Sequence, residues 1–320
     1  MKIVVLESKH VNPGDLSWDE VAKLGELVVY ESTDFFDEDL IASRIGDADI
    51  VMFNEVPISR RTIDRCPNLK LIAMLATGYN SVDYTYAREK GILVANVPTY
   101  GTEPVAQYTL AMLMELCSHI GYHNEMLHNR ARQGIAKPFQ WDLPLTELNG
   151  KTIGIIGFGR IGQTVGRMAK GFGMRVLAFD KFPNDSGRAI GEYVDLDTLL
   201  HEAHVISLNC PLFPENHEII RKENIDKMRD GVFLVNTARG QLIREQDLAD
   251  ALNSGKVKGA GLDVTAVEPV QPDNPLLEAK NCIITPHIAW MPVECRQRML
   301  TAATENIRAF LAGKPTNVVN

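Results

Sequence analysis

The sequence predicts an α/β protein built from two doubly wound parallel-sheet domains. Over roughly the first hundred residues, short apolar runs alternate with amphipathic stretches, which is the pattern of βαβ units. The alternation restarts at Lys151, and a glycine-rich turn follows the first apolar run of this second half. The 320 residues are enough for two domains of ordinary size.

The expected strands are short apolar runs bounded by polar or turn residues. They lie at Ile3–Leu6, Val28–Tyr30, Ile50–Phe53, Leu71–Leu75 and Leu93–Ala95, then at Thr152–Ile156, Arg175–Phe179, Val205–Leu208, Val232–Val235, Gly259–Leu262 and Cys282–Thr285. Helical patterns lie between them, and in the first half these cover 18–25, 38–45, 59–65 and 82–89. The amphipathic stretch Val293–Leu311 is expected to be the last helix, because Gly313 and Pro315 follow it.

One further apolar segment runs from Val105 to about His128 without a proline. We expect it to form a single buried helix. The stretch Gln133–Leu148 that follows holds Gly134, Pro138 and Pro144, and it predicts a loop.

Composition excludes several classes of protein. Hydrophobic residues make up 45% and charged residues 23% of the chain, which is typical of a globular protein. The net charge of −8 argues against nucleic acid or an anionic membrane as a main partner, and no apolar stretch is long enough for a membrane span. The five cysteines are scattered and form no metal-binding pattern, so we expect reduced thiols, no metal site and a cytoplasmic location.

The run TIGIIGFGRIG predicts a dinucleotide site. It places Gly157, Gly159 and Gly162 directly after an apolar strand and at the start of a helix. Gly157 permits the tight turn, Gly159 lets the backbone approach the pyrophosphate, and Gly162 lets the helix pack on the strand. The phosphates then meet the N–H groups at the helix N-terminus, where Arg160 and Ile161 lie.

The second strand of this half ends at Asp180, 18 residues after Gly162. A carboxylate at this interval accepts hydrogen bonds from the adenosine ribose and repels a 2′-phosphate, which favours NAD over NADP. The adjacent Lys181 weakens that preference. The alternative, a glycine turn with a solvated aspartate, does not explain why strand, turn, helix, second strand and acid occur in this order.

Three ionisable residues follow expected strands of the second half: Arg239 within VNTARG, Glu268 within LDVTAVEP and His287 within ITPHIAW. In open α/β sheets, ligands bind beyond the carboxyl ends of the strands. A cofactor that moves hydride needs a partner that moves a proton, and a histidine paired with a carboxylate suits this role. Arginine binds a carboxylate in a bidentate manner. Each residue taken singly is as consistent with a solvated side chain.

The sequence resembles the D-isomer-specific 2-hydroxyacid dehydrogenase family over essentially its whole length. The matching stretches, in order, are ATGYNSVD (76–83), NVPTYGTEPVAQYTLAMLMEL (96–116), LNGKTIGIIGFGRIG (148–162), VNTARG (235–240), GLDVTAVEP (261–269) and TPHIAW (285–290). The resemblance implies that Arg239 binds and orients the substrate, that His287 is the acid/base, and that Glu268 pairs with it.

The resemblance also implies further contacts with the cofactor and the substrate. On the cofactor, Asp263 is similar to the residue that holds the nicotinamide carboxamide, while Thr237 and Ala238 line the nicotinamide and Cys210 and Pro211 the adenosine side. On the substrate, the backbone of Thr77, Gly78 and Tyr79 is expected to hold the carboxylate, with Asn54, Glu55 and Val56 opposite.

The family architecture predicts a Rossmann NAD-binding domain at 100–290 inserted into a flavodoxin-like substrate domain formed by 1–99 and 291–320. The segment 105–128 and the loop 133–147 resemble the dimer contact of the family, so a homodimer is expected. The expected ligands are NAD and a small 2-oxo or 2-hydroxy acid.

Within the family, Trp141 and Trp290 resemble the glycerate dehydrogenase, or hydroxypyruvate reductase, type. Trp290 either narrows the substrate pocket or packs its loop onto the last helix. A D-lactate dehydrogenase remains an alternative, as does a non-catalytic NAD-sensing scaffold. Phosphoglycerate dehydrogenase is less expected because no regulatory extension follows residue 320, and formate dehydrogenase because the partner of His287 is Glu268 rather than glutamine.

Overall fold

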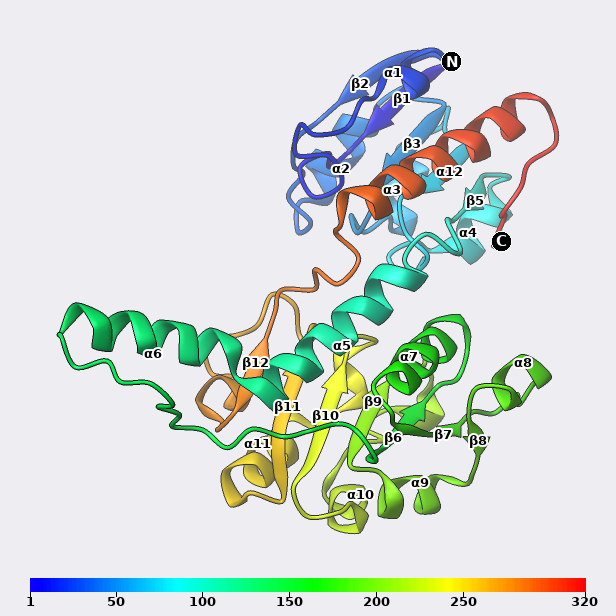
Figure 1. Cartoon of the computed structure of the whole chain (residues 1–320). Helices are drawn as coiled ribbons and strands as arrows, with labels where there is room; N and C mark the ends of the chain where they lie inside the picture. Colours follow the sequence, from blue (N-terminus) through cyan, green and yellow to red (C-terminus); the bar gives the residue numbers. More distant parts are fainter. The chain divides into compact units, whose positions relative to one another are not determined.

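The computed structural model describes all 320 residues, and the chain divides into two compact units. The first unit comprises Met1–Gly101 and Trp290–Asn320, and the second comprises Thr102–Ala289 (Figure 1). Each unit contains one parallel sheet with helices packed on it, which confirms the predicted fold class. No helix combines the length and the apolar character that crossing a membrane requires.

The first unit has a five-stranded sheet in the order β2-β1-β3-β4-β5, with every pair parallel. The strands are β1 (Lys2–Val5), β2 (Glu26–Val29), β3 (Ile50–Phe53), β4 (Leu71–Met74) and β5 (Leu93–Ala95). The helices are α1 (Asp19–Ala22), α2 (Glu38–Ile45), α3 (Arg60–Asp64), α4 (Tyr84–Glu89) and α12 (Val293–Leu311). The strand order reverses between β1 and β3, so the loops after these two strands flank the switch point of the sheet.

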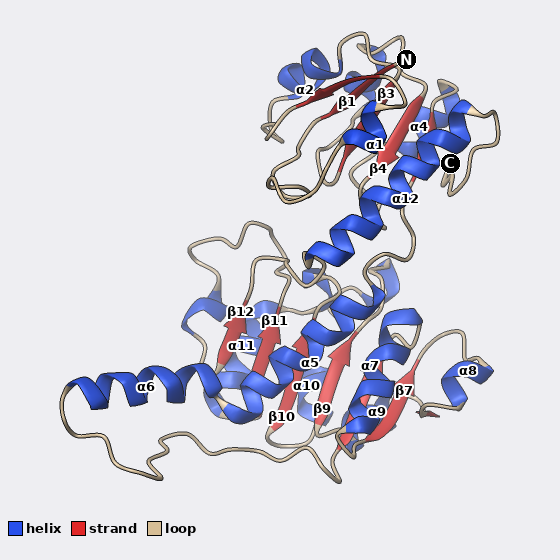
Figure 2. Ribbon diagram, turned by 45° about the horizontal axis from the view of Figure 1, so that its top comes forward, coloured by secondary structure: helices blue, strands red, loops and turns tan.

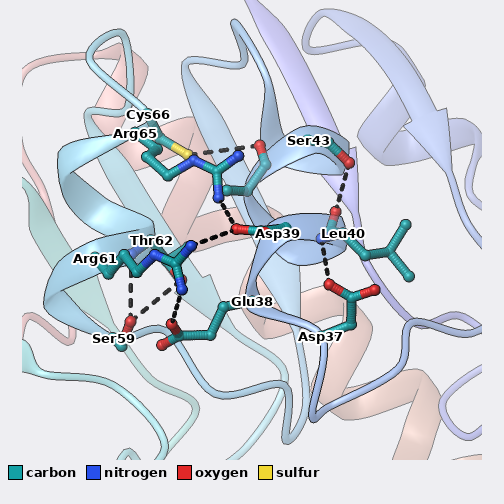
Figure 3. Close-up of polar contacts among 11 residues, drawn as sticks. Asp37, Glu38, Asp39, Leu40, Ser43, Ser59, Arg61, Thr62, Arg65 and Cys66 are labelled. Atoms are coloured by element: carbon teal, nitrogen blue, oxygen red, sulfur yellow. Dashed lines mark hydrogen bonds and ion pairs between the residues drawn. The ribbon is translucent and has the colours of Figure 1, made fainter.

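The core of the first unit forms because β3 and β4 are apolar at every position and are covered on both faces. Helix α12 packs against β4, and α2 packs beside α3. Figure 3 shows the polar contacts that join α2 and α3: Asp39 accepts hydrogen bonds from Arg61, at 2.8 Å, and from Arg65. These pairs are exposed, so each contributes at most about 1 kcal/mol.

The second unit has a seven-stranded parallel sheet in the order β12-β11-β10-β9-β6-β7-β8 (Figure 1). Its strands are β6 (Thr152–Ile156), β7 (Arg175–Phe179), β8 (Glu192–Tyr193), β9 (Val205–Leu208), β10 (Val232–Asn236), β11 (Val257–Leu262) and β12 (Cys282–Ile284). Its α-helices are α5 (Thr102–Ser118), α6 (Ile120–Arg132), α7 (Arg160–Gly171), α8 (Asp185–Arg188), α9 (Leu196–Glu202), α10 (Lys222–Lys227) and α11 (Glu245–Ser254). Three 3-10 turns lie at η1 (Pro214–Asn216), η2 (Gly240–Leu242) and η3 (Pro275–Glu278).

Alternate residues of these strands supply two separate apolar cores. Ile153 and Phe233 pack with α5 and α7 on one face, whereas Leu234 and Ile206 pack with α9, α10 and α11 on the other. The strand order reverses between β6 and β9, which is where an open α/β sheet binds its ligand. The glycine-rich turn leaves β6 at this point.

The prediction of one buried helix from Val105 to His128 is wrong. The helix ends at Ser118, His119 adopts the left-handed conformation with φ of 47°, and α6 begins at Ile120. None of the residues of α6 is buried, and the helix extends away from the rest of its unit in both views (Figures 1 and 2). The apolar pattern continues only to Cys117, so the segment that follows has no core-facing stripe.

Candidate active site

The glycine-rich turn after β6 has the geometry that a bound pyrophosphate requires. Gly157 has φ of 90°, and a Cβ there would lie 2.4 Å from the backbone nitrogen of Cys210. A Cβ on Gly162 would lie 2.1 Å from the Gly157 carbonyl oxygen, so this glycine permits close packing of α7 on β6. A Cβ on Gly159 would meet nothing within 4 Å, and the space before the N-terminus of α7 is therefore open to a ligand.

The carboxylate of Asp180 is held against this turn. It accepts the Phe158 N–H at 2.6 Å and the Phe182 N–H at 2.8 Å. Each carboxylate oxygen can accept more than one hydrogen bond, so the group keeps capacity for ribose hydroxyls. The turn, the helix N-terminus and this acid together fit a dinucleotide.

Replacing Asp180 with alanine should raise the Kd for NADH about tenfold and reduce the preference for NADH over NADPH. The Kd for NADH rises because the ribose hydroxyls lose a charged hydrogen-bond acceptor. The preference for NADH falls because the carboxylate that repels the 2′-phosphate of NADPH is gone. Fluorescence titration with both nucleotides measures the two constants. Asp185→Asn is the matched control, because Asp185 is an exposed acid whose partner is Arg188. An unchanged ratio of the two Kd values in Asp180→Ala would contradict the role of this residue.

The remaining residues predicted on the cofactor side lie around the same edge. Cys210 and Pro211 follow β9, and burial raises the pKa of the Cys210 thiol to about 11, so this thiol is not a reactive nucleophile. Thr237 and Ala238 follow β10, and the Thr237 hydroxyl lies 2.8 Å from that of Thr109 on α5. Contact of these residues with the cofactor stays a prediction.

Sequence reasoning missed one polar group at this edge. Asn209 directly follows β9, and its Oδ1 accepts the Ser207 hydroxyl at 2.8 Å. Its Nδ2 is buried without a hydrogen-bond partner, which leaves a donor for a ligand at the switch point. The rule that drew attention to Arg239, a polar residue just past an apolar strand, applies equally to Asn209.

Arg239 is positioned by a tight turn after β10. The Asn236 side chain is fully buried, donates to the Arg239 carbonyl at 2.8 Å and accepts the Ala238 N–H at 3.0 Å. A Cβ on Gly240 would lie 1.9 Å from the carbonyl carbon of Thr265, so only glycine allows this turn to contact the loop after β11. The turn that carries Arg239 and the loop that carries Glu268 are therefore packed together.

Glu268 and His287 form a direct pair. Glu268 Oε2 lies 2.8 Å from His287 Nδ1, and Glu268 Oε1 accepts the Thr265 N–H at 3.1 Å. The side chains are 36% and 31% exposed, so a substrate can reach them. His287 has φ of 55°, a left-handed conformation that is uncommon outside glycine and is often found at functional sites.

The ionisation of Glu268 is set by two opposing effects. Burial, the largest single effect, acts to raise its pKa, but it is outweighed by the combined lowering from the hydrogen bond and charge of His287 and, to a smaller extent, from Thr265 and Arg239. The pKa of Glu268 therefore lies below its ordinary value of 4.5. The carboxylate of Glu268 therefore stays charged at neutral pH and lies against His287 Nδ1.

Asp263 holds the loop that carries His287. Its carboxylate is 1% exposed and accepts the Thr285 hydroxyl at 2.7 Å and the Ile288 and Ala289 N–H groups at 2.9 and 2.8 Å. Burial raises the pKa of Asp263, although these hydrogen bonds act against it. Its predicted contact with the nicotinamide stays a prediction.

The residues predicted to bind the substrate carboxylate lie in the first unit, after neighbouring strands β3 and β4. The Asn54 side chain is buried and donates to the Leu75 carbonyl. The Thr77 hydroxyl donates a hydrogen bond to the Val97 carbonyl at 2.7 Å. The Thr77 carbonyl accepts a hydrogen bond from the Asn96 side-chain amide, also at 2.7 Å. Both loops are thus tied to the sheet, and Gly78 and Tyr79 follow in the second of them.

Trp290 is 9% exposed, and its indole ring packs edge-to-face on Tyr100 with ring centroids 6.3 Å apart. Such a contact is typical of an aromatic pair that stabilises a loop. The packing observed for Trp290 is thus on Tyr100, whereas packing on the last helix and a role in the substrate pocket stay predictions.

Comparison with known proteins gives consistent results. Residues 110–289 match the family model described as D-isomer specific 2-hydroxyacid dehydrogenase, NAD binding domain. The chain is 53% identical over 321 residues to a hydroxypyruvate reductase of Blautia hydrogenotrophica, with 100% of both chains covered. It is 40% identical over 298 residues to a glycerate dehydrogenase of Methylorubrum extorquens, with 92% of both chains covered. A solved structure of a Thermus thermophilus protein superposes with a TM-score of 0.88 at 35% identity, covering 100% of both chains.

The chain belongs to the D-isomer specific 2-hydroxyacid dehydrogenase family. It is an oxidoreductase that acts on 2-hydroxy acids, and NAD is its cofactor. The resemblance inferred from the sequence motifs is confirmed.

Proposed function

We propose that this protein reduces hydroxypyruvate to D-glycerate with NADH. The observation that carries the proposal is the 2.8 Å contact between His287 Nδ1 and Glu268, in the same unit as the glycine-rich turn. The relatives named hydroxypyruvate reductase and glycerate dehydrogenase support this choice of substrate.

Bound NADH supplies the hydride that the substrate carbonyl carbon receives. His287 donates a proton from Nε2 to the carbonyl oxygen, which becomes the hydroxyl of the product. Glu268 holds Nδ1, orients the ring and stabilises its protonated form. Arg239 uses one N–H on the Ala238 carbonyl, at 2.7 Å, and its remaining donors bind the substrate carboxylate and polarise the carbonyl.

The two units divide this work in our proposal. Residues 100–290 form the NAD-binding domain. The cofactor contacts the glycine-rich turn, Asp180, Asn209 and the residues predicted after β9, β10 and β11. Residues 1–99 and 291–320 form the substrate domain. There, the backbone of Thr77, Gly78 and Tyr79 binds the carboxylate of the substrate, with Asn54 beside them.

The effect of Glu268 on the acid is a testable part of this mechanism. Glu268→Gln should lower kcat/KM about tenfold at neutral pH and move the alkaline limb of the pH–rate profile to lower pH. Glutamine still accepts a hydrogen bond from Nδ1 but lacks the charge that stabilises the imidazolium. Steady-state kinetics across pH gives both values, with Glu278→Gln, an exposed acid, as the control. An alkaline limb at the same pH as in the wild type would contradict the pairing.

The same pair predicts the direction of a stability change. The pKa of Glu268 is lowered in the folded state, so its contribution to the free energy of unfolding is present above about pH 4.5 and is lost as pH falls through the lowered value. Glu268→Gln should therefore be less stable than the wild type at neutral pH and equally stable in strong acid. Chemical denaturation at the two pH values compares them.

We also propose a cytoplasmic homodimer. Large apolar side chains are exposed on α6 and on the loop after it: Ile120, Tyr122, Leu127, Ile135, Phe139, Trp141 and Leu145. An exposed apolar surface of this kind is typical of a contact with another chain. The five free cysteines support a reducing compartment. Sedimentation velocity tests the dimer, and a monomer at micromolar concentration would contradict it.

A panel of 2-oxo acids tests the substrate assignment. NADH oxidation is measured with hydroxypyruvate, glyoxylate, pyruvate and 3-phosphohydroxypyruvate, and kcat/KM is compared among them. We expect the highest value with hydroxypyruvate. Preference for pyruvate would instead support a D-lactate dehydrogenase, and no turnover with any acid would support the scaffold alternative.

A further inference from the structure

Glu7 is a buried carboxylate at the switch point of the first sheet. It lies just after β1, and its side chain is 1% exposed. Its Oε1 accepts three consecutive backbone N–H groups of the loop after β3: Asn54 at 3.0 Å, Glu55 at 2.6 Å and Val56 at 3.2 Å. A single oxygen atom of Glu7 thus accepts a hydrogen bond from each backbone N–H of residues 54–56.

The arrangement is a backbone anion site that the chain fills itself. Successive N–H groups that converge on one point form a concave site for anions. The second oxygen, Oε2, is buried and has no hydrogen bond, and its ion-pair partner is His10, whose Nδ1 lies 3.7 Å away. Burial raises the pKa of Glu7, while the three N–H groups act to lower it. Leaving one buried carboxylate oxygen without a hydrogen bond is costly, so this arrangement calls for an explanation.

A chain of hydrogen bonds connects Glu7, through Asn54, to the start of the loop that holds Thr77–Tyr79, which is proposed to bind the substrate. The backbone of Asn54 is fixed by Glu7, and the Asn54 amide donates to the Leu75 carbonyl, two residues before Thr77. The strands β1, β3 and β4 are neighbours in the sheet, so their carboxyl ends lie side by side at one edge. This is the edge at which open α/β sheets bind ligands.

We propose that Glu7 is a positioning residue for the 2-oxo acid. By occupying the N–H groups of residues 54–56, its carboxylate fixes Asn54 and denies this anion site to the carboxylate of the substrate. The substrate carboxylate is then directed to the Thr77–Tyr79 turn of the same unit. The inference rests on the proposed function, because it concerns the placement of the same substrate.

Kinetics of Glu7→Ala tests this role. We expect KM for hydroxypyruvate to rise about tenfold with a smaller change in kcat, because the emptied anion site misplaces the substrate carboxylate. The Kd for NADH should not change, since the glycine-rich turn lies in the other unit. Added formate, a carboxylate small enough for the space of the deleted side chain, should lower the KM of the variant toward the wild-type value. It should not lower the KM of the wild type, whose site is filled.

Two further variants complete the design. Glu7→Gln keeps the oxygen acceptor without the charge, and we expect KM to rise about threefold. Glu89→Gln, an exposed acid on α4, is the matched control and should keep wild-type constants. If Glu7→Ala is misfolded, as judged by loss of the cooperative thermal unfolding transition of the first unit, Glu7→Gln decides the question.

The outcomes separate this inference from the proposed function. A wild-type KM in Glu7→Ala and Glu7→Gln, or a raised KM in Glu7→Ala that formate does not lower, would overturn the role of Glu7. If the wild-type protein turns over no 2-oxo acid, the proposed function fails and the positioning role fails with it. The self-filled anion site is then judged by thermal unfolding alone, in which formate should stabilise Glu7→Ala and not the wild type.

Discussion

Replacing His287 with alanine is expected to lower kcat for the reduction of hydroxypyruvate by about 10²–10⁴-fold, the range that a general acid contributes. The imidazole is the group that Glu268 holds at 2.8 Å, and its Nε2 is the proton donor in the proposed mechanism. The Kd for NADH should stay at the wild-type value, because the glycine-rich turn and Asp180 hold the pyrophosphate and the adenosine ribose in this account. Stopped-flow measurement of NADH oxidation together with a fluorescence titration separates the two effects.

His201→Ala is the matched control for this experiment. His201 lies in the last turn of α9, is exposed and is distant in sequence from every proposed catalytic residue. Its removal should leave kcat unchanged. A His287→Ala variant that turns over hydroxypyruvate at the wild-type rate would remove His287 from the acid role.

Replacing Arg239 with alanine is expected to lower kcat/KM by about 10²–10⁴-fold, because two charge-assisted hydrogen bonds to the substrate are lost. Arg239→Lys should recover little of this loss. A lysine ammonium is a point charge and does not reproduce the planar, bidentate contact of a guanidinium with a carboxylate. The turn around Arg239 is held by Asn236 and Gly240 rather than by the guanidinium, so the fold should tolerate both variants.

The control for Arg239 is Arg244→Lys. Arg244 is nearby in sequence, but it is exposed and pairs with Glu218 on the surface. Its substitution should leave kcat/KM unchanged. Wild-type kcat/KM in Arg239→Lys would show that a single positive charge is sufficient and would contradict the bidentate contact.

Much of the fold is predictable because hydrophobic periodicity alone identifies its elements. The apolar runs at Ile50–Phe53, Thr152–Ile156 and Val205–Leu208 are strands with the expected bounds, and the last helix covers Val293–Leu311 as predicted. These segments are buried, so their side-chain pattern is dictated by the core. The Gly157–Gly162 turn was predictable because its first and last glycines each meet a steric demand that no other residue meets.

Other features depend on interactions that have no local pattern. The break at His119 uses a non-glycine residue in the left-handed conformation, and the nearby Gly121 lies inside α6 rather than at the break. The two-residue strand β8 is too short for a periodicity signal. The contact between Glu268 and His287 joins residues 19 apart on different loops, so the sequence placed both at one edge without showing that they meet.

The contact of Glu7 with residues 54–56 is the clearest case of this kind. The carboxylate and its three donors are separated by 47 to 49 residues, and only the pairing of β1 with β3 brings them together. An acid directly after a buried strand was the available signal. That Glu7 meets residues 54–56 could be inferred only from the order of the strands in the sheet.

The stereochemistry of the product tests the central claim most directly. Wild-type protein is incubated with hydroxypyruvate and NADH, and the glycerate formed is resolved by chiral chromatography. We expect the D-isomer alone, in an amount equal to the NADH consumed. Formation of L-glycerate, or consumption of NADH without glycerate, would contradict the account.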